Sequence, residues 1–154
     1  LNGIVDIFLP DFKYISSEMA ARYSNAPDYP EVAKRALAQM VKQTGEAKFD
    51  ERDMMKRGVI VRHLILPGHI KESKKAIRYL YETYGDQIYI SIMNQYTPMP
   101  GIEKRFKNLG RTITQKEYDE VVDYAVDLGV ENGFIQEGET AKESFIPQFD
   151  DTGL

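Results

Sequence analysis

The chain of 154 residues contains no cysteine. This absence excludes disulfides, thiolate metal sites and thiol nucleophiles among these residues. Only two histidines are present, His63 and His69, and two are too few for a metal site made of histidines alone. We therefore expect no metal site and no catalytic residue of the thiol type within this sequence.

Long apolar runs and clustered positive charge are also missing. No apolar stretch approaches the ~20 residues that a membrane-spanning helix needs, and residues 1–10 lack the basic start of a signal peptide. The net charge of −4 comes from mixed signs without a basic stripe, so nucleic acid is not an expected partner. These features predict a cytoplasmic domain that binds neither membrane nor nucleic acid.

The residues that are present suit one folded domain. Hydrophobic residues make up 42% of the chain, which is enough for a core, and charged residues make up 29%. The first residue is Leu1 rather than methionine, and a strand-like run begins at Gly3. We therefore expect an excised fragment of a longer protein.

Apolar runs alternate with helical patterns along the chain. Strands are predicted at residues 3–9, 59–66, 88–96 and 130–136, and helices at about 16–23, 28–44, 70–84 and 114–128. Residues 46–57 are interpreted as a surface excursion and 97–111 as a loop. Strands that alternate with helices are typical of right-handed βαβ units with a parallel sheet. The predicted domain covers residues 1–136, and residues 137–154 form a tail.

Charged residues follow the first predicted strand. In α/β folds, ligands gather at the carboxyl ends of the strands, where the loops converge. Asp11 and Lys13 are two residues apart, so in an extended chain both side chains point to the same side. Together they could bind the amino and carboxylate groups of a ligand or its ribose hydroxyls. An ion pair at the rim of the fold, worth roughly 0–1 kcal/mol, is an equal alternative.

Arg62 lies within the apolar run of the second long strand. An unpaired buried charge costs several kcal/mol, so the guanidinium must have a partner. That partner is either Asp6 or Asp11, or else the oxygen atoms of a ligand. The neighbouring His63 is interpreted as a packing histidine, whereas His69 is expected to be solvated.

A third cluster, Asn94-Gln95-Tyr96, forms the end of the next predicted strand. Gln95 and Tyr96 offer an amide and an aromatic face that suit an adenine ring, although a tyrosine at a strand end is also common core material. The loop that follows carries four cations, interpreted as solvated or as contacts for an acidic partner protein: Lys104, Arg105, Lys107 and Arg111.

Four segments resemble radical S-adenosylmethionine enzymes of the pyruvate formate-lyase-activating type, and the similarity extends over nearly the whole chain. The segments are residues 5–14, 26–29, 57–68 and 93–96. The resemblance implies a partial TIM-like (β/α)6 barrel, of which this chain would contain about three parallel βα units. It also implies that the parent protein is an oxidoreductase.

In that family, a Cys-x3-Cys-x2-Cys loop holds a 4Fe–4S cluster that cleaves S-adenosylmethionine. The resulting 5′-deoxyadenosyl radical takes a hydrogen atom, in the activating enzymes from a glycine of a partner glycyl-radical enzyme. By position, Asp11 and Lys13 match an Asp-x-Lys element near the methionine and ribose, and Arg62 matches a strand arginine of the same site. Gln95 and Tyr96 match the segment near the adenine. The cysteine loop is absent here, so we expect neither cofactor bound to this fragment.

Other functions remain open at this point. One is a cysteine-free, non-enzymatic module that binds a nucleotide-like ligand or a partner protein. Another is a Schiff-base aldolase built on Lys13, which would need a complete barrel. The gene upstream of Leu1 separates fragment from module, because a Cys-x3-Cys-x2-Cys sequence there favours the enzyme. Half a barrel also leaves an apolar strand edge unpaired, so the fragment is expected to self-associate.

We predict that the chain binds no iron–sulfur cluster, because such clusters are held by cysteine thiolates. Anaerobic reconstitution with iron and sulfide should leave no charge-transfer absorption in the visible spectrum after desalting. Absorption that survives desalting would contradict this prediction.

Overall fold

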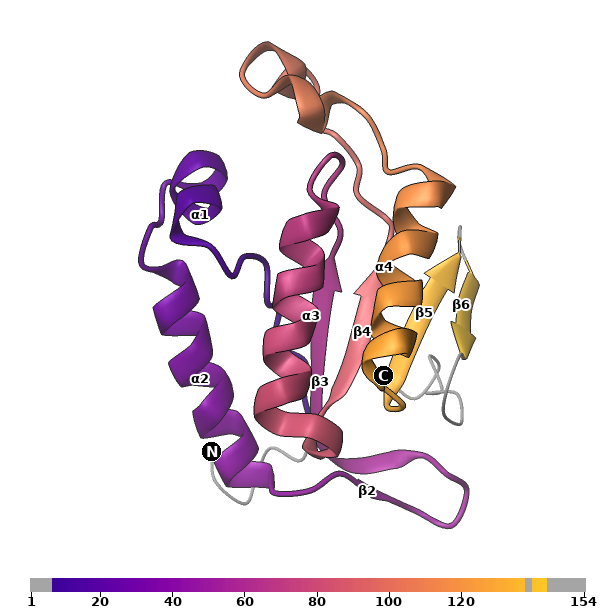
Figure 1. Ribbon diagram of the computed structural model, residues 1–154. Helices are drawn as coiled ribbons and strands as arrows, with labels where there is room; N and C mark the ends of the chain where they lie inside the picture. The colour runs from indigo at the N-terminus through magenta and orange to yellow at the C-terminus, as the bar shows by residue number, and fades with distance from the viewer. Residues whose placement is uncertain (1–6, 138–139, 144–154) are drawn as a thin grey trace.

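The computed structural model describes residues 7–137 and 140–143. They form two layers, with a six-stranded sheet covered on one face by helices (Figure 1). The strands are β1 (Ile7–Phe8), β2 (Lys48–Phe49), β3 (Met55–Leu64), β4 (Tyr89–Met93), β5 (Gly133–Glu137) and β6 (Thr140–Glu143). The helices are α1 (Ser17–Ser24), α2 (Tyr29–Thr44), α3 (Ile70–Tyr84) and α4 (Gln115–Leu128), with short 3-10 turns η1 (Gly85–Gln87), η2 (Ile102–Lys104) and η3 (Lys107–Gly110).

The sheet is open and mixed, so the predicted partial (β/α)6 barrel is wrong. Its strand order is β1-β3-β4-β5-β6, with β2 beside β3. The neighbours β1 and β3, β3 and β4, and β4 and β5 run parallel, whereas β2 and β6 run antiparallel to their partners. The alternation of strands and helices predicted the parallel pairs. It overlooked two strands that are joined to their neighbours by short connections, which permit only antiparallel pairing.

The hairpin of β2 and β3 replaces the predicted surface excursion at residues 46–57. The carboxylate of Asp50 accepts hydrogen bonds from the amides of Arg52 and Met54, at 2.8 and 3.1 Å, and so closes the turn. β3 consequently begins at Met55, earlier than predicted, and β4 ends at Met93, before the predicted end at residue 96. The predicted tail, residues 137–154, contains the last residue of β5 and the whole of β6, and its residues 138–139 and 144–154 lie outside the described residues. Of the predicted first strand, residues 3–6 also lie outside them.

The four predicted helices are confirmed within one or two residues at each end. Their boundaries follow local chemistry. The Ser16 hydroxyl accepts a hydrogen bond from the Met19 amide at the start of α1, and the Thr114–Glu117 capping box opens α4. Gly45 ends α2 with a positive φ of 69°. Each of these signals involves residues that are close together in sequence, so the helix boundaries could be predicted from the sequence alone.

The main core lies between the sheet and the helices. Val59 and Val61 of β3 and Ile90 and Ile92 of β4 are buried against residues of α3 and α4, including Ala76, Ile77, Leu80, Tyr118, Val121 and Ala125. A smaller buried cluster of Met55, Ile60 and Tyr89 lies apart from it. In the described residues, no helix has both the length and the apolar character needed to cross a lipid bilayer.

The loops that follow β1, β3 and β4 meet at one edge of the sheet, at the top of Figure 1, because these strands are parallel neighbours. One carboxylate ties two of the connecting segments together there. Glu117, whose side chain is only 15% exposed, accepts hydrogen bonds from Arg111 at 2.7 and 3.0 Å and from the Gly68 amide at 2.8 Å. Glu117 therefore links the segment before α4 to the turn between β3 and α3.

Glu117→Gln should destabilise the fold in a pH-dependent way. The hydrogen bond from Arg111, together with the amides of Thr114 and Gly68, lowers the pKa of Glu117 to about 2. A carboxyl group whose pKa falls on folding stabilises the protein above its unfolded-state pKa and loses that effect as the pH falls through the folded value. The free energy of unfolding should drop by about 1–3 kcal/mol at pH 7.

Denaturant unfolding at several pH values tests this prediction. The difference between wild type and Glu117→Gln should shrink as the pH falls from about 5 towards 2. Glu82→Gln is a suitable control, because it removes one member of an exposed ion pair within α3. A Glu117→Gln variant as stable as this control at pH 7 would show that the link contributes nothing.

Candidate ligand-binding site

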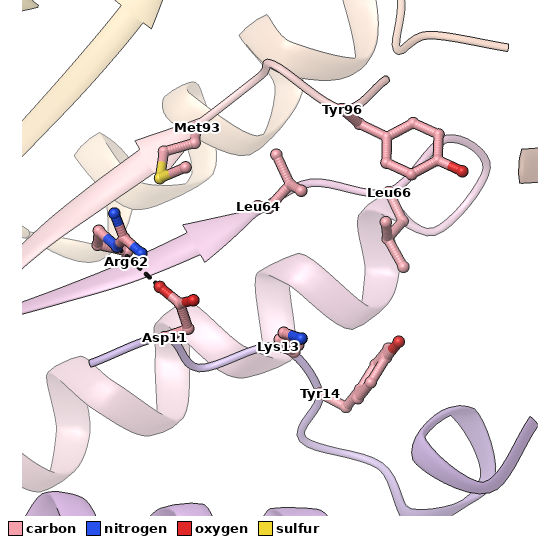
Figure 2. A pocket seen from close by; sticks show the side chains of 8 residues that line it. All are labelled: Asp11, Lys13, Tyr14, Arg62, Leu64, Leu66, Met93 and Tyr96. Carbon is pink, nitrogen blue, oxygen red and sulfur yellow. Dashed lines mark hydrogen bonds and ion pairs between the residues drawn. The ribbon is translucent and has the colours of Figure 1, made fainter. Parts of the chain in front are cut away.

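A cleft opens at the edge where β1, β3 and β4 end (Figure 2). It is lined by residues that follow β1, by alternate residues of β3 and its extension, and by residues at the end of β4: Asp11, Lys13, Tyr14, Arg62, Leu64, Leu66, Met93 and Tyr96. Four of the five residues predicted to bind a cofactor are therefore brought to one place. Gln95 is not among the lining residues, and its role stays a prediction.

An ion pair lies at one end of the cleft. Arg62 Nε lies 2.7 Å from Asp11 Oδ1, and the two side chains are 44% and 46% exposed. The sequence suggested a buried guanidinium, and that expectation is wrong. Arg62 points to the face of the sheet opposite the main core, and its ion-pair partner is Asp11. A guanidinium has five N–H donors and Nε supplies one of them here, so Arg62 is suited to bind a further anionic group.

The other end of the cleft is aromatic. Figure 2 shows the rings of Tyr14 and Tyr96 away from the ion pair, with Leu66 beside them and Lys13 between the two ends. The Tyr96 hydroxyl donates to the Leu109 carbonyl oxygen at 2.8 Å, and the Tyr14 hydroxyl is bonded to Ser24 at 3.0 Å. Burial raises the pKa of Tyr96, so its hydroxyl stays protonated at neutral pH and remains a donor. Both hydroxyls are engaged by other segments, and the rings serve as apolar walls.

This arrangement suits a ligand with a charged group at one end and a planar apolar group at the other. The cleft has a volume of about 230 Å³, whereas complete small-molecule sites occupy roughly 300–1,000 Å³. The described residues would therefore enclose only part of a drug-sized ligand. They also contain no group of three histidine, aspartate or glutamate residues placed to hold a metal ion.

Four lining residues were missed in the sequence analysis: Tyr14, Leu64, Leu66 and Met93. A signal for two of them was available. Side chains alternate between the faces of a strand, so Leu64 and Leu66 should share the face of Arg62. Tyr14 and Met93 reach the cleft through the path of the chain beyond β1 and the pairing of β4 with β3, and neither is readable from local sequence.

The two histidines lie outside the cleft. His63 is buried, as the interpretation of a packing residue required, and both of its ring nitrogens have partners. His69 was expected to be solvated, but it is half-buried and its Nε2 lies 2.6 Å from the Tyr23 hydroxyl. Burial lowers the pKa of His69. Neither histidine is placed to act on a ligand in the cleft.

Comparison with known proteins yields one distant relative and no family. No family profile matches the chain. An uncharacterized protein of Methanocaldococcus jannaschii is 28% identical over 125 residues, which is 81% of this chain and 32% of the relative. The chain thus matches about a third of the length of that protein.

Arg62→Ala should change the stability of the ligand-free protein by no more than ~1 kcal/mol, because exposed ion pairs contribute little. Arg57→Ala is a matched control on the same strand. Arg57 donates to the carbonyl oxygens of Thr44 and Gln43, at 2.8 and 2.9 Å, and so anchors the end of α2. Denaturant unfolding should therefore show a larger loss for Arg57→Ala. A loss of ~3–5 kcal/mol for Arg62→Ala would instead indicate a buried, structural ion pair.

Proposed function

We propose that this chain is part of a radical S-adenosylmethionine enzyme of the pyruvate formate-lyase-activating type, and that its cleft binds part of the cofactor. The observation that supports the proposal is the convergence of Asp11, Lys13 and Arg62 on one cleft. These are the residues that match the Asp-x-Lys element and the strand arginine of that family. Asp11 and Arg62 are 51 residues apart in sequence and form an ion pair in the cleft.

The side chains of the cleft fit the chemistry of S-adenosylmethionine. Lys13 and Arg62 would balance the charge of its carboxylate, and Asp11 would accept hydrogen bonds from its amino group or ribose hydroxyls. The ring of Tyr96 would pack against the adenine. When bound and reductively cleaved, the cofactor supplies a 5′-deoxyadenosyl radical that abstracts hydrogen.

The residues present do not fit a 4Fe–4S cluster, since the chain has no cysteine. A complete enzyme would need thiolates from another part of its polypeptide. The relative from Methanocaldococcus jannaschii, of which the match covers 32%, shows that similar sequences occur within longer proteins. The proposed parent enzyme acts on a glycyl-radical enzyme or another substrate by hydrogen abstraction. Its proposed location is the cytoplasm, where thiols stay reduced.

Binding of S-adenosylmethionine to the full-length gene product tests the proposal. Lys13→Ala should weaken binding by about 10- to 100-fold, which corresponds to one charged hydrogen bond of ~1.5–3 kcal/mol. Lys116→Ala is the matched control, because it removes the same charge from an exposed position on α4. Equal affinities for the two variants would contradict the proposed site.

Two further observations, the sequence of the full-length gene product and an assay for cofactor cleavage, distinguish the enzyme from a non-enzymatic module. The enzyme requires a cysteine loop elsewhere in the gene product and cleavage of the cofactor after reconstitution and reduction. Binding without a cysteine loop and without cleavage would favour a module that recognises a nucleoside-like ligand. Failure of the wild type to bind S-adenosylmethionine at all would reject the proposal.

A further inference from the structure

Tyr29 does not line the cleft, yet it contacts three of the residues that do. Its phenol oxygen accepts a hydrogen bond from the Lys13 amide at 2.9 Å and donates one to the Asp11 carbonyl oxygen at 3.0 Å. Its ring meets that of Tyr14 edge to face, with the centroids 5.7 Å apart. One side chain thus bridges the backbone on both sides of Phe12 and supports an aromatic wall of the cleft.

The position of Tyr29 is fixed from outside the cleft. Tyr29 is the first residue of α2, and its amide donates to the Ala26 carbonyl oxygen at 3.0 Å. Pro30 follows within the first turn, where its fixed φ favours the start of a helix. α2 in turn buries Leu37 in the main core. The phenol is therefore held by a packed helix and does not depend on the cleft for its place.

Phe12 is held by β3, and Tyr29 bonds to the backbone of the residues on both sides of it. The Phe12 amide donates to the Arg62 carbonyl oxygen at 2.8 Å, and its own carbonyl oxygen is bonded to His63. The carbonyl group of Asp11 and the amide of Lys13 flank this anchored residue, and Tyr29 joins them. The directions of the Asp11 and Lys13 side chains follow from the backbone angles on either side of Phe12.

The phenol can perform both roles only while it is protonated. Burial raises the pKa of Tyr29, and the nearby Asp11 carboxylate raises it further. The hydroxyl therefore keeps its proton at neutral pH and donates it to the Asp11 carbonyl oxygen while its lone pair accepts from Lys13.

We propose that Tyr29 is a positioning residue, which fixes Asp11 and Lys13 in the orientation that a ligand with ammonium and carboxylate groups requires. The proposal rests on the proposed function of the cleft and adds to it a residue that does not touch the ligand. Loss of the hydroxyl leaves the Lys13 amide and the Asp11 carbonyl group near the surface, where water can bond to them. The cost should therefore appear in ligand affinity rather than in stability.

The test compares Tyr29→Phe with wild type in the full-length gene product. Phenylalanine keeps the ring contact with Tyr14 and removes only the two hydrogen bonds. Tyr84→Phe is the matched control, because Tyr84 is a half-buried tyrosine at the far end of α3. Amide hydrogen exchange should quicken in a peptide that covers residues 11–16 and stay unchanged in one that covers β3. Affinity for S-adenosylmethionine should fall about 5- to 20-fold, and Tyr84→Phe should alter neither quantity.

The two measurements give distinct outcomes. Faster exchange with unchanged affinity would overturn the positioning role and leave the proposed function intact. Unchanged exchange at residues 11–16 would overturn it as well, because the hydroxyl would then fix nothing. A wild-type protein that does not bind S-adenosylmethionine would reject the proposed function, and this inference with it.

Discussion

The buried imidazole of His63 joins two segments that line the cleft, β3 and the chain after β1, to the helix α3. A carbonyl oxygen only accepts hydrogen bonds, so Nδ1 donates to the Phe12 carbonyl oxygen, and Nε2 accepts from the Ser73 hydroxyl on α3, both at 2.8 Å. Burial lowers the pKa of His63 and keeps the ring neutral, as this pattern requires. The chain after β1, the strand β3 and the helix α3 are thereby held in one arrangement, and an unpaired polar group at this depth would cost about 1–3 kcal/mol.

Glu72, which precedes Ser73 in α3, adds a second link between this helix and the chain after β1. The Glu72 carboxylate, which is buried, accepts hydrogen bonds from the amides of Ile15 and Ser16, at 2.7 and 2.8 Å. α3 therefore holds the end of the segment that carries Asp11, Lys13 and Tyr14 through Glu72, and His63 of β3 holds its middle. Tyr29 fixes the same segment from α2. The segment has almost no regular structure, and side chains from the surrounding helices and β3 give it a defined path.

Buried and exposed ionisable side chains have different roles in this protein. His63 and Glu72 are buried. Both ring nitrogens of His63 are bonded, to the Phe12 carbonyl oxygen and to Ser73, and Glu72 Oε2 accepts from two backbone amides, so these contacts hold the fold together. Asp11 and Arg62 are nearly half exposed, and their mutual ion pair lies at one end of the cleft. Because an exposed pair contributes little to stability, its two members are the ones that a ligand can engage at small cost to the fold.

The sequence by itself determined the helices, their caps and the edge at which the candidate site lies. Those features rest on local periodicity, on capping residues such as Thr114, and on the rule that parallel strands end at one edge. Tertiary structure decided the rest: the antiparallel strands β2 and β6, the exposure of Arg62 and its pairing with Asp11, and the contacts of Tyr14 and Tyr29 with the cleft. The physical reason is distance along the chain, because Asp11 and Arg62 are separated by 51 residues and only the pairing of β1 with β3 brings them together.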